Sequence, residues 1–175
     1  MSIENIRSSM EKTISYLKAN PEKAKIKGKA ATAVLESGLK VRTTGPKDQM
    51  IISDIPSTLG GGESAPAPGW FMQAALAACY ASGIALKAAQ ESIELSTLEV
   101  SIDAESDARG FFGLDETIEA GPVNVKTSVL IGAKGVEEDK LRDLVKQVYK
   151  YSWVGNAVRR SVPIKTEVEI VYTSP

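Results

Sequence analysis

The feature that most constrains the fold is a long run of small apolar residues near the middle of the chain. It reads PGWFMQAALAACYASGIALK from Pro68 to Lys87. Pro68 is well suited to the first turn of a helix, and the pattern continues to about Gln90. Alanine, serine and glycine leave little bulk on any face of such a helix, so neighbouring elements can approach it closely. We therefore expect this helix to lie buried at the centre of a domain.

The composition around this helix is that of an ordinary globular protein. The chain has 175 residues, of which 43% are hydrophobic and 25% charged, and its formal net charge is -1. That is enough apolar material for one core. No basic run indicates a nucleic-acid partner. The apolar stretch from Phe71 to Leu86 is interrupted by polar and small residues, and we expect it to be too short for a membrane span. No signal sequence opens the chain, so we expect a cytoplasmic protein.

The chain has no histidine and a single cysteine, Cys79. The absence of histidine removes the commonest general base and metal ligand, and it excludes Ser-His-Asp and Cys-His mechanisms. A zinc site would need carboxylates and one thiolate, an improbable set. We therefore expect no metal and no cofactor. Acid–base chemistry is left to carboxylates, lysine, tyrosine or the thiol itself. One cysteine cannot form an internal disulfide, which agrees with a reducing compartment.

The start of the chain predicts an appended helix. Apolar residues recur at intervals of three and four over residues 2–19, and Asn20-Pro21 stops the pattern. A polar, lysine-rich linker follows. We expect residues 1–28 to form a helix and linker outside a domain of residues 29–175. The helix could pack on a partner subunit.

The rest of the chain alternates strands with two long helices and predicts an α+β fold of antiparallel sheets. A loop dense in Gly, Pro and Ser fills residues 54–67. Its Gly60-Gly61-Gly62 run favours a turn over a phosphate-binding loop. A second loop runs through Arg109 to Phe112. Strands are expected at residues 29–36, 39–44, 49–53, 98–105, 123–131 and 165–172. After the helix of Pro68, a second helix should reach from about Glu137 to about Tyr151, with a short helical turn at 153–160.

An ordered set of motifs resembles the OsmC/Ohr family, from about residue 29 onward. The first motifs are Asp54-x-Pro56, Gly60-Gly61, Pro66-x-Pro68 and Ala74-Ala75-Leu76-x-Ala78-Cys79. The segment from Tyr151 to Val158, followed by Val162-Pro163-Ile164, is similar to the family's C-P-V-S-x-x-L segment and the strand after it. The resemblance implies an intertwined homodimer with two central helices per subunit and sites at the subunit interface.

The resemblance also implies a chemistry centred on Cys79. In the peroxidase members, the first cysteine attacks an organic hydroperoxide and becomes a sulfenic acid. A second cysteine resolves it as a disulfide, which a dithiol reductant opens. An arginine and a glutamate near the first cysteine keep it ionised and oriented.

This sequence departs from that pattern at three positions. Ser152 stands where the second cysteine is expected, and a hydroxyl cannot resolve a sulfenic acid. The usual acid would fall near Gly69 or Trp70, so the nearest carboxylate is Glu63. Arg42 is the guanidinium closest to the expected arginine position. Cys79 is expected in mid-helix, where its own helix dipole does little for a thiolate, and burial without a cation would raise its pKa.

Two functions stay open at this point, with a third possibility beside them. The first is a one-cysteine peroxidase that reduces organic hydroperoxides and is recycled by an external thiol, with Cys79 as nucleophile and Arg42 or Glu63 as tuning residues. The second is a non-catalytic dimer that binds a small hydrophobic ligand at the subunit interface, in a pocket lined by Trp70, Phe71, Ser152 and Trp153. In the third, the N-terminal helix recruits a partner to a structural or regulatory dimer.

Overall fold

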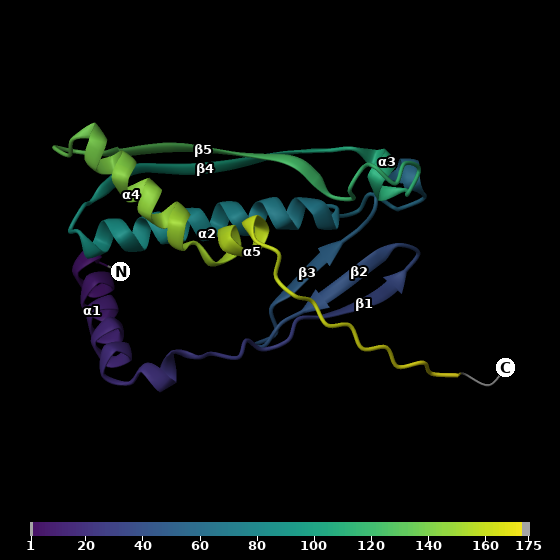
Figure 1. Cartoon of the computed structure of the whole chain (residues 1–175), viewed down its shortest axis with the longest axis horizontal. Helices are drawn as coiled ribbons and strands as arrows, with labels where there is room; N and C mark the ends of the chain where they lie inside the picture. Colours follow the sequence, from purple (N-terminus) through teal and green to yellow (C-terminus); the bar gives the residue numbers. More distant parts are fainter. Residues whose placement is uncertain (1, 173–175) are drawn as a thin grey trace.

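The computed structural model describes residues 2–172, and helix α2 (Pro68–Gln90) lies at its centre (Figure 1). It contacts helices α1 (Ile3–Ala19), α4 (Glu138–Tyr151) and α5 (Trp153–Arg159), and strand β4 (Leu95–Ser106). Its buried residues recur along one side of the helix, at Leu76, Tyr80, Ile84, Ala88 and Ala89. The central place expected for the alanine-rich helix is confirmed.

Strand β4 pairs with β5 (Pro122–Ala133) to make a long antiparallel ribbon over α2. Val100 lies opposite Val129 and Ile102 opposite Thr127. Half-buried and exposed residues alternate along both strands, because successive side chains of a strand point to opposite faces. The predicted wet and dry faces are confirmed. The core joins α2, α4 and this ribbon, with Leu76, Tyr80, Ile84, Ala88, Ile93, Leu141, Leu144 and Val148 buried at its centre.

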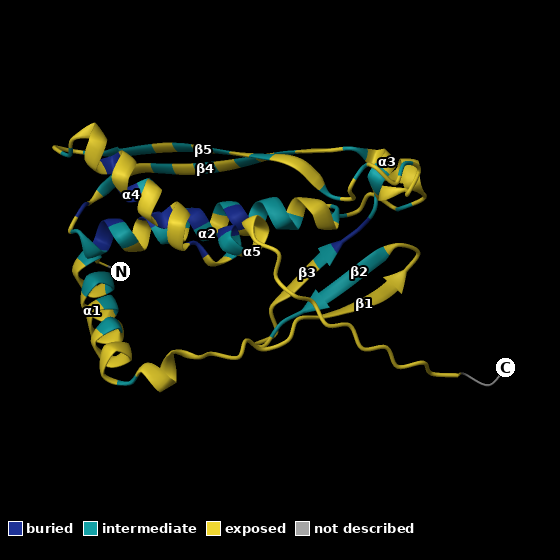
Figure 2. Cartoon of the chain, viewed as in Figure 1, coloured by how far each residue is buried: buried dark blue, intermediate teal, exposed yellow. Residues whose placement is uncertain are grey.

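A second sheet stands apart from this core. It contains β1 (Thr32–Ser37), β2 (Lys40–Thr44) and β3 (Met50–Ser53), antiparallel and in that order. Gly38 turns the first hairpin with a φ of 56°, a conformation that glycine adopts at no steric cost. Every residue of β1 is exposed, and Figure 2 shows the contrast with the buried half of α2. The three predicted strands are confirmed, each starting one to three residues later than expected.

The loop after β3 closes around one buried carboxylate. Asp54 accepts hydrogen bonds from the backbone N–H groups of Ile55 (2.8 Å), Gly62 (3.3 Å) and Ser64 (3.0 Å), and from the Ser64 hydroxyl (2.7 Å). A side chain at Gly61 would place its Cβ 1.9 Å from the Ile55 carbonyl oxygen, so the chain needs glycine there. The glycine run is therefore a turn packed against Asp54, as the sequence indicates.

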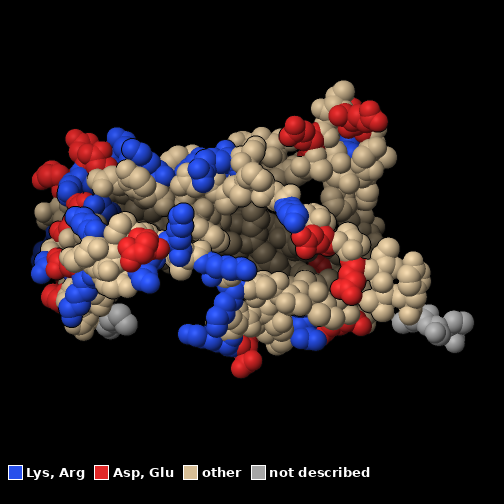
Figure 3. Space-filling model, turned by 60° about the horizontal axis from the view of Figure 1, so that its bottom comes forward, with Lys and Arg blue, Asp and Glu red and all other residues tan. Residues whose placement is uncertain are grey.

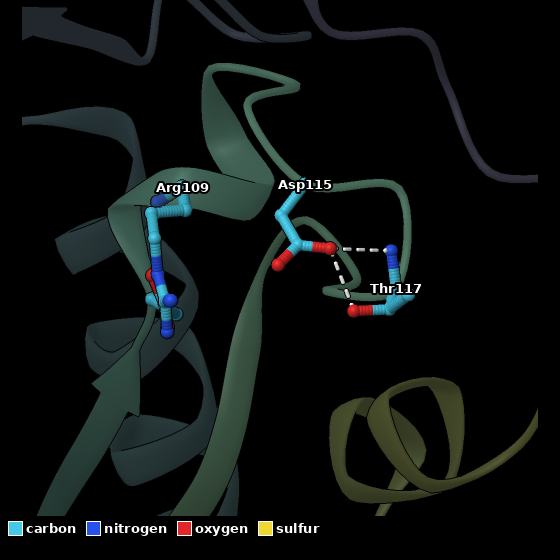
Figure 4. Close-up of polar contacts among 4 residues, drawn as sticks. Arg109, Asp115 and Thr117 are labelled. Atoms are coloured by element: carbon cyan, nitrogen blue, oxygen red, sulfur yellow. Dashed lines mark hydrogen bonds and ion pairs between the residues drawn. The ribbon is translucent and has the colours of Figure 1, made fainter.

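The loop expected through Arg109 contains one helical turn, α3 (Ala108–Phe111). The carboxylate of Asp107 caps it by accepting a hydrogen bond from the Arg109 N–H at 2.9 Å and also pairs with the Arg109 guanidinium. Asp115 then folds the connection to β5 by accepting from the N–H and the hydroxyl of Thr117 (Figure 4). The predicted lysine-rich linker likewise includes a short 3-10 helix, Pro21–Ala24.

The strand expected at residues 165–172 is wrong for the isolated chain. Residues 161–172 have no strand partner, and they run out from α5 along an exposed path (Figure 1). A strand needs a neighbour to accept its backbone hydrogen bonds. The apolar side chains of residues 161–172 are correspondingly exposed, among them Ile164 (90%), Val168 (80%), Ile170 (69%), Val171 (79%) and Tyr172 (89%).

Helix α2 is long and apolar enough, by length and composition, to cross a membrane. The expectation that this stretch is too short is therefore wrong. The core helix of a globular domain satisfies the same criteria, and α2 contacts a strand and three helices in this structure.

Candidate functional site

The site is built around a contact between the only cysteine and a buried serine. Cys79 is half-buried on α2, and its Sγ lies 3.2 Å from the Oγ of Ser152. Ser152 is the N-cap of α5 and is 5% exposed. Its Oγ accepts a hydrogen bond from the Gly155 N–H at 3.0 Å. That bond uses a lone pair of the oxygen and not the hydroxyl proton, so the proton is free to point at the sulfur.

The first turn of α5 offsets the effect of burial on the thiol. Burial raises the pKa of Cys79. Hydrogen bonds from the Ser152 hydroxyl and from the backbone N–H groups of Val154, Trp153 and Gly155 together lower it by more, so the net pKa lies below the ordinary thiol value. Cys79 lies in the middle of α2, as expected. The expectation that burial without a cation would raise its pKa is wrong, because the hydrogen-bond donors at the N-terminus of α5 outweigh burial.

Three side chains tie α5 to the two long helices. The Arg159 guanidinium donates to the Tyr80 hydroxyl at 2.9 Å and to the Tyr149 carbonyl at 2.7 Å. It also lies 4.0 Å from the Tyr149 ring centroid, and the Tyr80 and Tyr149 rings stack with centroids 5.8 Å apart. Tyr80 is the residue after Cys79, so these contacts link α5 to the turn of α2 that carries the thiol. Arg159 therefore has a structural role at the site.

Gly155 allows α5 to approach α2 closely. A Cβ at this position would lie 2.6 Å from the Tyr80 Oη and 2.9 Å from the Ser152 Oγ. A larger residue would therefore push the first turn of α5 away from the thiol.

Cys79 opens into an apolar cavity of about 570 Å³. Its floor is one face of α2, and α4, the start of α5 and Met10 of α1 complete the wall. The lining residues are Met10, Cys79, Ser82, Gly83, Leu86, Lys87, Gln90, Gln147, Val148, Tyr151, Ser152 and Trp153. The volume suits a small hydrophobic molecule.

The structure brings three of the predicted site residues together and leaves the others elsewhere. Cys79, Ser152 and Trp153 share the cavity. Trp70 and Phe71 pack edge to face on each other, with centroids 5.6 Å apart, in the first turn of α2 and outside the cavity lining.

The two proposed tuning residues have local partners in the isolated chain. Arg42 pairs with Glu36 across the first hairpin at 2.7 Å. Glu63 accepts a hydrogen bond from the Ser57 hydroxyl at 2.8 Å. Neither lines the Cys79 cavity, so a role near the thiol stays a prediction for the assembled dimer. Among residues 2–172, no group of three or more His, Cys, Asp or Glu side chains is placed to hold a metal ion.

Sequence reasoning missed two parts of the site. The backbone donors of α5 carry no side-chain signature, although Ser152 before a helical turn is an N-cap signal. Met10 lies far from Cys79 in the chain, so only the packing of α1 on α2 reveals that both line one cavity.

Comparisons with known proteins agree on one fold family. The family model described as OsmC-like protein matches residues 60–167, more than half of the chain. The matched part includes the Cys79 helix and α5. No curated protein sequence matches the chain.

Solved structures give the same result for the backbone. An OsmC-like protein from Mycoplasma pneumoniae is similar with a TM-score of 0.66 and 17% identity, over 77% of this chain and 89% of that one. An organic hydroperoxide resistance protein from Legionella pneumophila has a TM-score of 0.57 and 20% identity, over 77% and 91%. One from Elizabethkingia anophelis has a TM-score of 0.57 and 18% identity, over 77% and 90%. At these identities the likeness concerns the fold.

Proposed function

The chain belongs to the OsmC-like protein family, and on that premise we propose that it is a one-cysteine thiol peroxidase acting on organic hydroperoxides. The observation that carries the proposal is the donor set around Cys79. A hydroxyl and the N-terminal turn of α5 lower the pKa of its thiol inside an apolar cavity. The thiolate is the nucleophilic form of cysteine, and an apolar cavity accepts the organic group of a hydroperoxide.

The proposed first step is a two-electron oxidation of the sulfur. The Cys79 thiolate attacks the terminal oxygen of the hydroperoxide, a sulfur–oxygen bond forms and the oxygen–oxygen bond breaks. The alkoxide leaves and takes up a proton to become an alcohol. The transferred oxygen keeps its own hydrogen, so Cys79 is left as a sulfenic acid.

The proposed second step needs an external thiol, because Ser152 offers no sulfur. The external thiol attacks the sulfenic sulfur, water leaves and a mixed disulfide forms. A second thiol then opens that bond and restores Cys79, with release of the oxidised reductant. A supply of such thiols is typical of the reducing cytoplasm, which is the location we propose.

We propose further that two copies of the chain assemble as an intertwined homodimer. Apolar side chains are exposed on the three-stranded sheet, at Val34 (46%), Leu35 (63%), Met50 (60%) and Ile51 (49%), and along residues 162–172. Figure 3 shows a hollow with an uncharged surface on the bottom of the molecule, with charged side chains around it. A second copy would cover these surfaces, and it could bring Arg42 or Glu63 to the Cys79 site.

The decisive test is the fate of the Cys79 thiol when the full chain meets cumene hydroperoxide. We expect stoichiometric loss of the thiol, a trappable sulfenic acid, and repeated turnover when a thiol reductant is added. A Cys79→Ser variant is the control and should show none of these. A thiol that survives excess hydroperoxide in the folded protein would rule the activity out.

The cavity itself favours a second candidate, a non-catalytic dimer that binds a small hydrophobic ligand. About 570 Å³ of largely apolar space can hold such a molecule whether or not the thiol reacts. Native mass spectrometry of gently purified protein tests this candidate. A co-purifying apolar molecule, displaced by Ser82→Leu in the cavity wall, is the expected result, and protein free of any ligand would count against it.

A further inference from the structure

The cavity that contains Cys79 adjoins a second apolar cavity. The second has a volume of about 390 Å³ and lies between α1 and α2. It is lined by Ile6, Ser9, Met10, Thr13, Ile14 and Leu86. Met10 and Leu86 line both cavities, so these two side chains stand at the boundary between them.

The boundary lies at a defined distance from the thiol. The α2 residues of the first cavity, from Cys79 to Gln90, recur at alternating intervals of three and one and so occupy one helix face. With a rise of about 1.5 Å per residue, Leu86 stands roughly 10 Å along the helix from Cys79. The first cavity continues past Leu86 to Gln90, and Met10 together with Leu86 separates it from the second cavity.

Met10 is held there by the packing of α1. The half-buried residues Ile3, Ile6, Met10 and Ile14 follow one face of this helix, which contacts α2. Arg7 fixes the start of the helix by donating a hydrogen bond to the Ser92 hydroxyl at 2.6 Å. None of the residues of α1 is fully buried, so a change at Met10 alters the cavity more than the core.

We propose that Met10 is a specificity-determining residue that sets the length of hydrophobic molecule able to reach Cys79. The inference rests on the proposed function for the role of Cys79 as the reacting group, but the cavity boundary exists without it. A short side chain at position 10 joins the two cavities and admits a longer apolar tail. A large one closes the passage between the two cavities. Because α1 lies outside the matched residues 60–167, this determinant comes from a part of the chain beyond the family match.

The test measures alkylation of Cys79 by N-ethylmaleimide and by N-octylmaleimide, whose tail extends toward position 10. The quantity of interest is the ratio of the octyl to the ethyl rate constant in the full-length protein. We expect Met10→Trp to lower this ratio by about tenfold, the effect of withdrawing roughly two methylene groups from apolar contact. Met10→Ala should raise it. Lys12→Trp, on the exposed side of the same helix, is the matched control and should leave it unchanged.

The two variants and the control decide the inference together. An unchanged ratio in folded Met10→Trp or Met10→Ala overturns it, and so does an equal fall in Lys12→Trp. If Met10→Trp does not fold, the Met10→Ala ratio decides alone. A shifted ratio in a protein whose thiol ignores hydroperoxides would keep the inference and reject the peroxidase.

Discussion

The Sγ of Cys79 and the Oγ of Ser152 lie 3.2 Å apart, although 73 positions separate the two residues in the chain. This contact joins the central helix to the N-cap of α5. It brings the serine hydroxyl, which can donate, within hydrogen-bond distance of the sulfur.

Removing the Ser152 hydroxyl should make Cys79 less reactive. Hydrogen bonds to charged groups contribute about 1.5–3 kcal/mol, so the loss of this donor in Ser152→Ala should raise the pKa of Cys79 and slow its alkylation at pH 7 by about tenfold. The pH profile of iodoacetamide alkylation measures this. Ser82→Ala removes a hydroxyl elsewhere in the cavity and should leave the profile in place. Equal profiles for Ser152→Ala and the unchanged protein would contradict the assignment.

A cysteine at position 152 should give Cys79 an internal resolving partner. The present contact of 3.2 Å shows that the two side chains already meet. Ser152→Cys should form an intramolecular disulfide on mild oxidation, seen as loss of both thiols in a monomeric chain on a denaturing gel. Ala157→Cys, on the exposed side of α5, is the control and should keep both thiols free. Two free thiols in oxidised Ser152→Cys would mean that the pair does not approach in solution.

The Arg159 contacts should hold α5 in the orientation that serves the thiol. Arg159→Gln removes the donors to the Tyr80 hydroxyl and the Tyr149 carbonyl. We expect a raised pKa of Cys79, read from the alkylation profile, because the first turn of α5 is then less firmly held. Arg160→Gln keeps those contacts and has the same charge change, so its profile should match the unchanged protein. Arg159→Lys should recover only part of the effect, since lysine lacks the guanidinium fork.

A methyl group at Gly155 should disturb the same turn by crowding. Its Cβ would lie 2.6 Å from the Tyr80 Oη, closer than real contacts allow. Gly155→Ala should lower the free energy of unfolding by about 1–3 kcal/mol, the usual cost of overpacking. Denaturant unfolding measures it. Gly69→Ala, where nothing lies within 4 Å of the added Cβ, should be neutral or slightly stabilising.

The loop around Asp54 should weaken in acid. Hydrogen bonds from the N–H and hydroxyl of Ser64 and from the N–H groups of Ile55 and Gly62 lower the pKa of Asp54 from 3.8 to about 2. A carboxyl with a lowered pKa in the folded state stabilises that state above its unfolded pKa and loses the contribution as pH falls toward 2. Asp54→Asn should be less stable at pH 7 and should lose less stability between pH 4 and pH 2. Asp48→Asn, a neighbouring acid on a turn, is the control, and parallel acid curves for both variants would contradict the role of Asp54.

Much of the fold could be predicted because its signals are local. The helix that begins at Pro68 and ends at Gln90 follows from proline placement and small apolar residues, and the alternation from Leu98 to Ala104 predicts one dry face of β4. The prediction of a final strand at residues 165–172 was wrong for a physical reason. Alternation at 165–172 predicts a strand, but a strand also needs a partner edge, which periodicity cannot supply.

The sequence by itself determined that Cys79 is the only thiol of the chain and that no histidine can serve as a base beside it. It also determined that this thiol lies on a central helix of small residues. Only the tertiary structure decided the thiol's environment. The hydroxyl of Ser152, the N-terminus of α5 and the Met10 side chain come from distant parts of the chain. Their effect on the sulfur depends on distance and direction in space, and helix packing alone sets those.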